Sequence, residues 1–345
     1  MTAGGSMWAA VLHGPGDVRL ERRPVPEPGP GELLVRISAC GICGSDLMDW
    51  YVAAKAPFVF GHEPVGTVAG GDAAAGALAP GTRVFVHHHA PCGRCAACRR
   101  GDDVHCSLWR QQALDPGGMA QYARVLPQAV RSDVLPLPDD VDDLDGTLIE
   151  PTACAVKALR RGGFAAGQRV FIIGLGFMGQ VLGRLARHLG AAWVGGSDPI
   201  EGRRRLALAW ADAAVTPEEV AAGLGPAAAG EPADLVIVTP PSEPALRQGF
   251  AAVRDGGRVL LYSPTPRGQD VPLPLGDLFF REVDLLFSYS AGPQDTRAAL
   301  DLISAGVVRA RDLVSRVLPL ERVAEAYRMV KDPDVLKVVV TMNGE

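Results

Sequence analysis

Four cysteines in the N-terminal half lie close enough in the sequence to bind a single metal ion. They are Cys92, Cys95, Cys98 and Cys106, in the spacing C-x2-C-x2-C-x7-C. Four thiolates on one short loop can surround a Zn²⁺ ion tetrahedrally, and such a closed shell leaves no coordination position for a substrate. The spacing therefore predicts a structural zinc lobe at about residues 91–107. Buried free cysteines and an iron–sulfur cluster are the alternatives, although the Cys-Pro that often ends a cluster motif is absent.

Two earlier segments offer metal donors of mixed chemistry. They are the run Cys40-Gly-Ile-Cys43-Gly-Ser45-Asp46 and the run Gly61-His62-Glu63. Each is weak evidence by itself, because Cys-x-x-Cys pairs also occur in thioredoxin-like proteins and a single histidine is more often an ordinary hydrogen-bonding residue. Together they offer a thiolate, an imidazole and carboxylates, which is the donor set of a catalytic zinc. Such an ion lowers the pKa of an oxygen group bound to it, which is how a catalytic zinc activates water or a hydroxyl.

A glycine-rich run, Gly174-Leu-Gly176-Phe-Met-Gly179, follows the apolar residues Val170–Ile173 and opens a helical segment. This context is typical of dinucleotide binding, because backbone N–H groups at a helix N-terminus can approach a pyrophosphate closely. Asp198 ends the next predicted strand, ~20 residues further on, where a carboxylate accepts hydrogen bonds from the adenosine ribose. This position favours NAD. The run Arg203–Arg205 leaves NADP open, since a guanidinium can accept a 2′-phosphate.

Two different patterns of predicted secondary structure along the chain indicate which domain contains each of these segments. Short β-prone runs broken by Gly and Pro extend to about residue 131 and predict an irregular β-rich domain. From about residue 142, apolar strands alternate with helical segments, which predicts a parallel sheet with crossover helices. The strands expected there are Arg169–Ile173, Ala192–Ser197, Asp234–Thr239 and Arg258–Tyr262. The elements expected after them are a helix at Asp295–Ala305, an extended run at Leu313–Leu318, a helix at Glu321–Val330 and a strand at Leu336–Thr341.

Length and charge limit the class of protein. With 345 residues and 48% hydrophobic composition, the chain is long enough for roughly two domains. Its net charge of −5 argues against nucleic acid and anionic membranes as partners, because both select clustered positive charge. The most apolar stretch, Val170–Leu189, is interrupted by Gln180 and Arg184, so no membrane span is expected. The start does not resemble a signal peptide, and the seven cysteines are therefore expected as thiolates in the cytoplasm. Residues 1–6 are expected as a loose extension, and Ala221–Ala229 as a helix end with a surface loop.

The segments together resemble zinc-containing members of the medium-chain alcohol dehydrogenase superfamily. The resemblance covers nearly the whole length in order: GICGSD, GHE, the four-cysteine lobe, LIEP at residues 148–151, and the glycine-rich turn. It implies a Rossmann doubly wound parallel sheet plus a GroES-like irregular β-barrel catalytic domain, with the active site in the cleft between them. The implied bounds are 1–152 for the catalytic domain, 153–290 for the Rossmann domain and 291–345 for a C-terminal segment returning to the catalytic domain.

The resemblance also implies roles for individual residues, with two zinc ions per chain. Cys43 and His62 would bind the catalytic zinc, Asp46 would orient a ligand, and Cys40 would be structural. Glu150 falls at the family's third ligand position and is expected as the resting ligand. Glu63, after the ligand histidine, is expected as an exchanging group or as a residue that supports the ligands.

Proton transfer and cofactor binding follow from the same resemblance. Ser45 is expected to accept the alcohol proton, but Met48 stands where many relatives have the histidine that ends the relay. One of His87–His89 could contribute, although an exposed strand end is the favoured interpretation of that run. The residues expected to contact NAD, with NADP as the less favoured cofactor, are Gly174, Gly176, Phe177, Met178, Gly179, Asp198, Arg203, Thr239 and Lys337.

The predicted function is oxidation of a secondary alcohol of a polyol, sugar alcohol, cyclitol or sugar to the ketone. A dehydrogenase of a threonine-type hydroxy amino acid is the first alternative, but no charged clamp for the amino acid can be placed. A non-catalytic zinc and nucleotide-binding protein is the second, and a zinc-free quinone or enone reductase is the third. The expected partner is a small alcohol, and family habit favours a homodimer or homotetramer.

Overall fold

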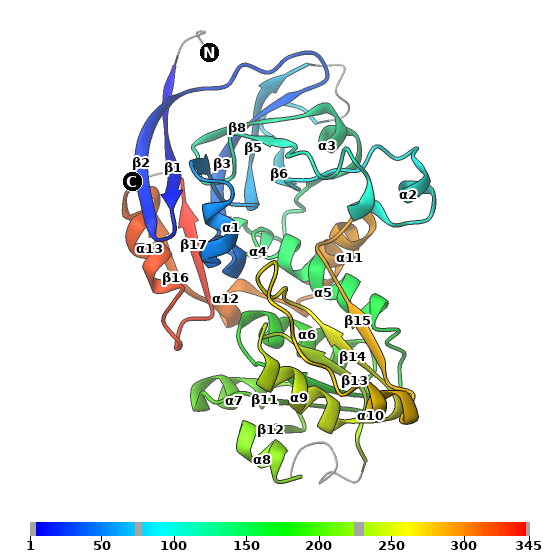
Figure 1. Ribbon diagram of the computed structural model, residues 1–345. Coiled ribbons are helices and arrows are strands. Elements are labelled where there is room, and N and C mark those ends of the chain that lie inside the picture. The colour runs from blue at the N-terminus through cyan, green and yellow to red at the C-terminus, as the bar shows by residue number, and fades with distance from the viewer. Residues whose placement is uncertain (1–4, 73–77, 224–230, 343–345) are drawn as a thin grey trace. The chain divides into compact units, whose positions relative to one another are not determined.

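The computed structural model describes residues 5–72, 78–223 and 231–342. Most of the two expected loose segments, 1–6 and 221–229, lies outside these residues, although strand β1 already begins at Ser6. The chain divides into two compact units, one formed by residues 1–153 and 291–345 and the other by residues 154–290. Each unit has its own sheets and its own core, and they are described in turn (Figure 1).

The first unit is built mainly from antiparallel β-structure. One sheet has the strand order β16-β17-β3-β5-β6-β9, with β8 paired to β3 and β7 paired to β8, and a smaller sheet has the order β2-β1-β4. The strands of the larger sheet are β3 (Leu33–Gly41), β5 (Glu63–Gly71), β6 (Arg83–Val86), β7 (Leu114–Asp115), β8 (Tyr122–Val125), β9 (Val134–Pro136), β16 (Val314–Pro319) and β17 (Lys337–Thr341). Those of the smaller sheet are β1 (Ser6–Gly14), β2 (Asp17–Pro24) and β4 (Phe58–Val59).

The C-terminal segment completes this sheet. Strand β17 pairs antiparallel with β3, with Val340 opposite Cys40, so the last strand of the chain lies beside one of the first, red against blue in Figure 1. The four elements predicted after residue 290 are present as α11 (Pro293–Ser304), β16, α13 (Val323–Met329) and β17. The other helices of this unit are short: η1 (Gly44–Leu47), α1 (Asp49–Ala53), α2 (Ala96–Arg99), η3 (Asp103–His105), α3 (Pro127–Ser132), α4 (Asp143–Gly146), α12 (Ala310–Leu313) and η5 (Leu320–Arg322).

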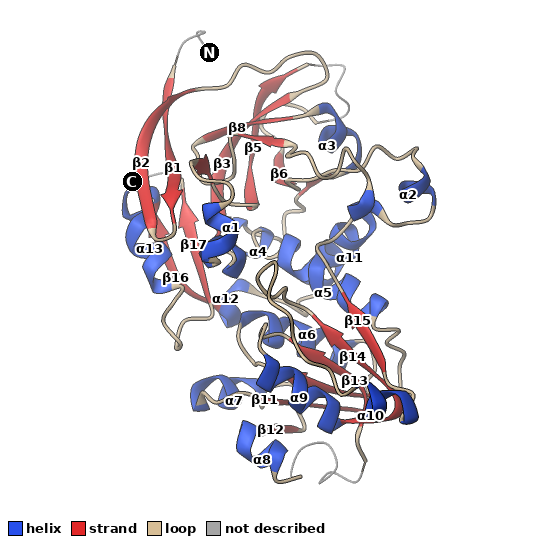
Figure 2. Ribbon diagram, in the orientation of Figure 1, coloured by secondary structure: helices blue, strands red, loops and turns tan. Residues whose placement is uncertain are grey.

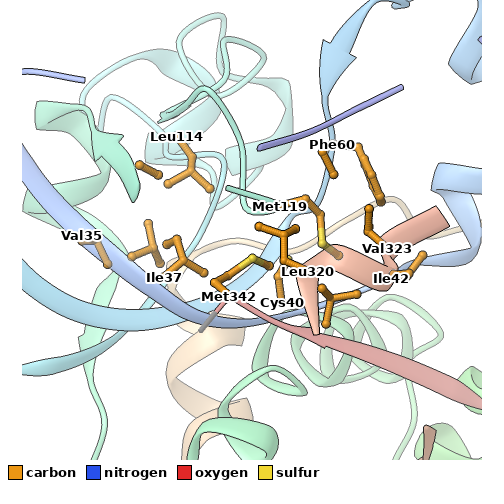
Figure 3. Close-up of a cluster of buried hydrophobic side chains, with 14 of the residues drawn as sticks. Val35, Ile37, Cys40, Ile42, Phe60, Leu114, Met119, Leu320, Val323 and Met342 are labelled. Carbon is orange, nitrogen blue, oxygen red and sulfur yellow. The ribbon is translucent and has the colours of Figure 1, made fainter. Parts of the chain in front are cut away.

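The core of the first unit collects apolar side chains from strands distant in the sequence. Val35 and Ile37 alternate along β3 on the buried face, as the period of two in a strand requires. They join Met119, Leu320 and residues of β17 in one cluster (Figure 3). Fully burying one side chain of this size stabilises the fold by roughly 1.5–3 kcal/mol. The cluster therefore holds β3 and its neighbouring strands in place.

The second unit confirms the predicted doubly wound parallel sheet. Its strand order is β12-β11-β10-β13-β14-β15, and every pair is parallel. The strands are β10 (Arg169–Ile173), β11 (Trp193–Ser197), β12 (Ala213–Val215), β13 (Ala233–Val238), β14 (Val253–Leu261) and β15 (Asp284–Phe287). The helices are α6 (Phe177–His188), α7 (Glu201–Ala207), α8 (Pro217–Ala221), α9 (Glu243–Ala252) and α10 (Leu275–Phe280), and α5 (Ile149–Arg161) leads into this unit (Figure 2). The short edge strands β12 and β15 were not predicted, because neither shows a long apolar run.

Candidate active site

Strand pairing brings Cys43, His62 and Glu63 together in the first unit. Gly41 at the end of β3 lies opposite Glu63 at the start of β5, and Cys43 follows directly as the residue that caps η1. One ligand atom from each of the three residues lies within 4.8 Å of those of the other two. Gly41 is required here, because a Cβ atom at this position would lie 1.9 Å from Glu63 Oε2. A thiolate, an imidazole and a carboxylate converge at this point, which fits a zinc ion with a further position open to substrate.

Asp46 contacts both Cys43 and His62, and Tyr327 in turn contacts Asp46. Asp46 is 2% exposed, its Oδ2 accepts a hydrogen bond from the Cys43 amide at 3.3 Å, and its Oδ1 lies 3.6 Å from His62 Nδ1. The Tyr327 hydroxyl donates to the Asp46 carbonyl oxygen at 2.8 Å. Burial disfavours the charged imidazole of His62, but the acidic groups of Asp46 and Cys43 outweigh it and hold its pKa well above the usual value. Cys40 lies in the core, and burial raises the pKa of its thiol.

Lys337 forms a buried ion pair with Glu63. Its Nζ lies 2.5 Å from each carboxylate oxygen, and the two side chains are 3% and 0% exposed. Burial alone would favour the neutral amine, but the Glu63 carboxylate outweighs it and raises the pKa of Lys337. Lys337 was expected to reach the cofactor phosphates, and in the structure its ammonium group contacts Glu63 inside the first unit.

Glu150 lies in a second group rather than with Cys43 and His62. It is the second residue of α5, 5% exposed, and it shares with His87 and His88 a set of ligand atoms that lie within 4.8 Å of one another. Glu63 therefore lies closest to the thiolate and imidazole of the first group, and Glu150 is near enough to act electrostatically on both Glu63 and Lys337.

The interpretation of the histidine run as an exposed strand end was wrong. His87 is fully buried, and its Nδ1 lies 2.6 Å from Oδ2 of Asp133, which is also buried. Burial opposes the charged ring, but Asp133 outweighs it and raises the pKa of His87. Burial and the neighbouring histidines lower the pKa of His88 well below the usual value. The run ends a buried strand whose neighbours come from distant parts of the chain, so no local pattern marked it.

The four-cysteine lobe is assembled around its sulfur atoms. Cys95 Sγ lies 3.4 Å from Cys98 Sγ, and the four ligand atoms lie within 4.8 Å of one another. Backbone amides point at the sulfurs, from Cys95 to Cys92 Sγ and from Cys92 to Cys106 Sγ, each at 3.3 Å. Backbone hydrogen bonds of this kind lower the pKa of Cys92 to about 6, so its thiolate is already favoured. The donor set fits a closed tetrahedral zinc site.

The glycine-rich turn of the second unit is closely packed. Gly174 has a φ of +87°, and a Cβ atom there would lie 2.3 Å from Thr239 Oγ1, which itself donates to the carbonyl oxygens of Ile173 and Gly174. A Cβ atom on Gly179 would lie 2.0 Å from the Gly174 carbonyl oxygen. Thr239 therefore fastens the turn, and the turn needs glycine for both its conformation and its space.

Asp198 ends β11 close to this turn. It is 2% exposed and accepts hydrogen bonds at 2.8 Å from the amides of Leu175 and Ile200. Arg203 Nη1 lies 3.7 Å from Asp198 Oδ2. Phe177 and Met178 begin α6, and Gly176 caps it. All the residues expected to contact the cofactor, except Lys337, therefore lie around the glycine-rich turn or just after adjacent strands.

Ser45 is half-buried on η1, and Met48 follows as the residue that caps its end. Two residues that organise the site, Asp133 and Tyr327, were missed at the sequence level. Each acts through a partner more than 40 residues away, His87 for Asp133 at a separation of 46 and Asp46 for Tyr327 at a separation of 281.

Comparison with known proteins finds a matching family for a large part of each unit. Residues 29–139 match the family described as "Alcohol dehydrogenase GroES-like domain", and residues 178–305 match "Zinc-binding dehydrogenase". Sorbitol dehydrogenase of Gallus gallus is 32% identical over 99% of this chain and 98% of its own length. "Probable D-xylulose reductase A" of Aspergillus clavatus is 30% identical over 96% of this chain and 95% of its own length. A putative zinc-binding dehydrogenase of Sinorhizobium meliloti, solved bound to NADP, is 30% identical with a TM-score of 0.86, covering 98% of this chain and all of the other.

Proposed function

The chain belongs to the zinc-dependent medium-chain alcohol dehydrogenase family, and we propose that it oxidises a secondary alcohol of a polyol or sugar to the ketone, with NAD as hydride acceptor. The observation that carries the proposal is the convergence of Cys43, His62 and Glu63 within 4.8 Å. The printed activities of the relatives, sorbitol dehydrogenase and D-xylulose reductase, support a polyol as substrate. In this proposal the first unit is the catalytic domain and the second binds the nucleotide.

Cys43, His62 and Glu63 are the proposed ligands of the catalytic zinc. When bound there, zinc lowers the pKa of a substrate hydroxyl, and the nicotinamide accepts the hydride. With three side-chain donors, the site would not be closed to substrate in the way that a shell of four cysteines would be. Asp46 Oδ1 lies 3.6 Å from His62 Nδ1, so it would favour a proton on that nitrogen and leave the other ring nitrogen available as a donor.

Glu63 replaces Glu150 as the proposed resting ligand. It lies with Cys43 and His62, whereas Glu150 lies with two other histidines. Lys337 Nζ contacts both carboxylate oxygens of Glu63, so an ion bound by Glu63 would compete with this ion pair. Lys337 is therefore proposed as a positioning residue that limits how far Glu63 approaches the metal.

Ser45 is the proposed proton acceptor, because its hydroxyl lies two residues after the ligand Cys43 on the half-buried helix η1. Met48 has no titratable group, so it cannot take the next proton. From Ser45 the alcohol proton would therefore have to leave by a route other than a side chain at position 48.

Asp198 supports NAD over NADP. Its carboxyl group is buried just after β11, at the position where an acidic residue accepts hydrogen bonds from a ribose and disfavours a 2′-phosphate. Arg203 is the group that could reverse this preference, since its guanidinium lies 3.7 Å from the same carboxylate. The ratio of kcat/KM for NAD and NADP measures the preference, and a ratio that favours NADP contradicts the role of Asp198.

Exposed apolar side chains of the second unit support a homo-oligomer. Leu275, Phe279, Phe280, Phe287 and Tyr289 are 60 to 86% exposed and lie on or beside α10 and the edge strand β15. Such a concentration is unusual on a monomer and marks an interaction surface. We expect a homodimer or homotetramer, which sedimentation velocity would distinguish.

The described helices include none long and apolar enough to cross a membrane. We propose a cytoplasmic location, because the proposed zinc sites need cysteine thiolates, which a reducing compartment preserves.

A substrate screen tests the proposed function. Zinc-loaded enzyme is mixed with NAD and a panel of polyols, cyclitols, sugars, hydroxy amino acids and simple secondary alcohols, and NADH absorbance is followed. We expect turnover of at least one polyol, cyclitol or sugar, and its loss in Cys43→Ser. Preference for threonine-type substrates would support the amino acid dehydrogenase instead, and activity retained in Cys43→Ser would contradict a zinc mechanism at this site.

A further inference from the structure

The contact with Asp46 fixes only part of the orientation of the His62 ring. The His62 side chain is 17% exposed, and the distance of 3.6 Å between its Nδ1 and Asp46 Oδ1 is longer than an ordinary hydrogen bond. The orientation of a histidine that binds a metal depends on the residues packed around it. Further support for this ring therefore has to come from side chains that pack on its flank.

Three aromatic ring contacts lead from His62 into the four-cysteine lobe. The ring centres of His62 and His88 lie 4.9 Å apart, at an interplanar angle of 46°. Those of His88 and His89 lie 4.0 Å apart, and those of His89 and Trp109 lie 4.2 Å apart. These distances are at the short end of the range over which aromatic rings attract one another. We call the four side chains the ring row: His62, His88, His89 and Trp109.

The far end of the ring row is anchored in the lobe. Trp109 is 1% exposed and lies in a buried cluster with Val104 and Cys106, against which Cys92, Cys95, Cys98 and Leu108 pack. A large side chain that is packed on all sides keeps one rotamer. Trp109 is therefore a rigid base for the ring of His89.

The backbone of the histidine run is also held in place. The Ala113 amide donates a hydrogen bond to the His88 carbonyl oxygen at 2.7 Å, and the His87 amide donates one to the Asp133 carbonyl oxygen at 3.1 Å. The side chain of His87 adds a second contact, since its Nδ1 lies 2.6 Å from Asp133 Oδ2. Because the backbone is fixed at both residues, the ring of His88 cannot move away from His62 without breaking these contacts.

We propose that the ring row positions the His62 imidazole for the catalytic zinc, with Trp109 as its fixed end. His88 supports the imidazole directly, whereas His89 and Trp109 are positioning residues that act through it. The lobe then has a role in addition to local stability, because one of its own side chains supports a ligand of the other zinc. This role rests on the proposed function, since it takes His62 as a ligand of the catalytic zinc.

Zinc release from the full-length protein tests the ring row. The protein is saturated with Zn²⁺, freed of excess ion and mixed with a coloured chelator, and the ion of the Cys43 group is identified as the release phase that Cys43→Ser lacks. We expect His89→Leu to release this ion about 2- to 10-fold faster, because it breaks the row of aromatic contacts. His89→Phe keeps a ring at the same position and should release the ion at the wild-type rate.

A double-mutant cycle tests whether Trp109 acts through His89. Trp109→Leu should also speed release of the Cys43 ion, and the variant with both substitutions should release it no faster than His89→Leu, because the row is already broken. The lobe ion is followed separately in the Cys43→Ser background. Trp8→Leu is the matched control, because it removes the same type of side chain from β1 of the same unit, outside the ring row. It should release the ion at the wild-type rate.

The outcomes separate the ring row from the proposed function. Release at the wild-type rate in His89→Leu, or equally accelerated release in His89→Leu and His89→Phe, would overturn the ring row and leave the dehydrogenase mechanism intact. Additive effects of His89→Leu and Trp109→Leu would do the same. A wild type without a zinc that depends on Cys43 would overturn both proposals. His89 is half-buried, so its two variants carry the test even if Trp109→Leu does not fold.

Discussion

The four-cysteine lobe and the Cys43 group are the two proposed zinc sites, and their donor residues are brought together in opposite ways. The lobe takes its ligands from 15 consecutive residues, and its own backbone amides point at the sulfurs. The Cys43 group takes one donor from the turn after β3 and two from the residues at which β5 begins, His62 just before the strand and Glu63 as its first residue. Asp46, Tyr327 and Lys337 contact this group or its supports. A local, closed shell contributes stability, whereas an open shell held by distant strands is available for chemistry.

Treatment with a chelator should show the largest difference between the two proposed zinc sites. A strong zinc chelator is expected to abolish activity completely while the lobe keeps its ion, because the Cys43 group offers fewer protein ligands and an open position. Zinc content and rate are measured on the same samples over time, and added Zn²⁺ should restore activity. Simultaneous loss of both ions would contradict the distinction.

Removing one ligand from each region is the next largest effect. Cys43→Ser should lower kcat/KM roughly 10³-fold, because a metal-stabilised charge contributes several kcal/mol and each 1.4 kcal/mol is about tenfold. Its Tm should change little. Cys106→Ser should show the reverse, with a lower Tm and near-normal kcat/KM for the molecules that stay folded. Equal loss of activity in both variants would show that the lobe also takes part in the reaction.

Asp46→Asn tests whether the carboxylate beside His62 contributes to metal binding at the Cys43 group. The amide keeps the shape but cannot hold the His62 ring by charge, so we expect metal affinity or activity to fall about 10- to 100-fold. The zinc affinity and kcat/KM of the variant are measured together. An unchanged zinc affinity would mean that Asp46 only supports the fold.

Tyr327→Phe is the smallest change. It removes the hydrogen bond to the Asp46 carbonyl oxygen but keeps the ring packed edge-to-face on Phe60, with ring centres 5.9 Å apart. The free energy of unfolding should fall by about 0.5–1.5 kcal/mol, and kcat/KM should fall only a few-fold. Urea unfolding measures the first quantity. Loss of activity as large as that of Cys43→Ser would indicate that Tyr327 acts in the reaction itself.

Prediction from the sequence succeeded where a feature depends on neighbouring residues. Strand β10 was predicted with the bounds that the structure shows, because an unbroken apolar run leads straight into the glycine turn. The family and the enzyme class are confirmed by the comparisons. The assignment of individual site residues stays a proposal. Edge strands β12 and β15 escaped prediction, since strands of three or four residues, none of them fully buried, carry little periodic signal.

The spacing of the cysteines, the glycine turn and the alternation of strands and helices are properties of the sequence by itself, because each involves atoms only a few residues apart. Tertiary structure alone decided that Glu63 lies beside Cys43, that Lys337 neutralises it, and that the histidine run is buried against Asp133. These three contacts depend on the register of paired strands or on which distant side chain contacts a buried polar atom. Local spacing carries no information about either, and only packing of the whole core settles them.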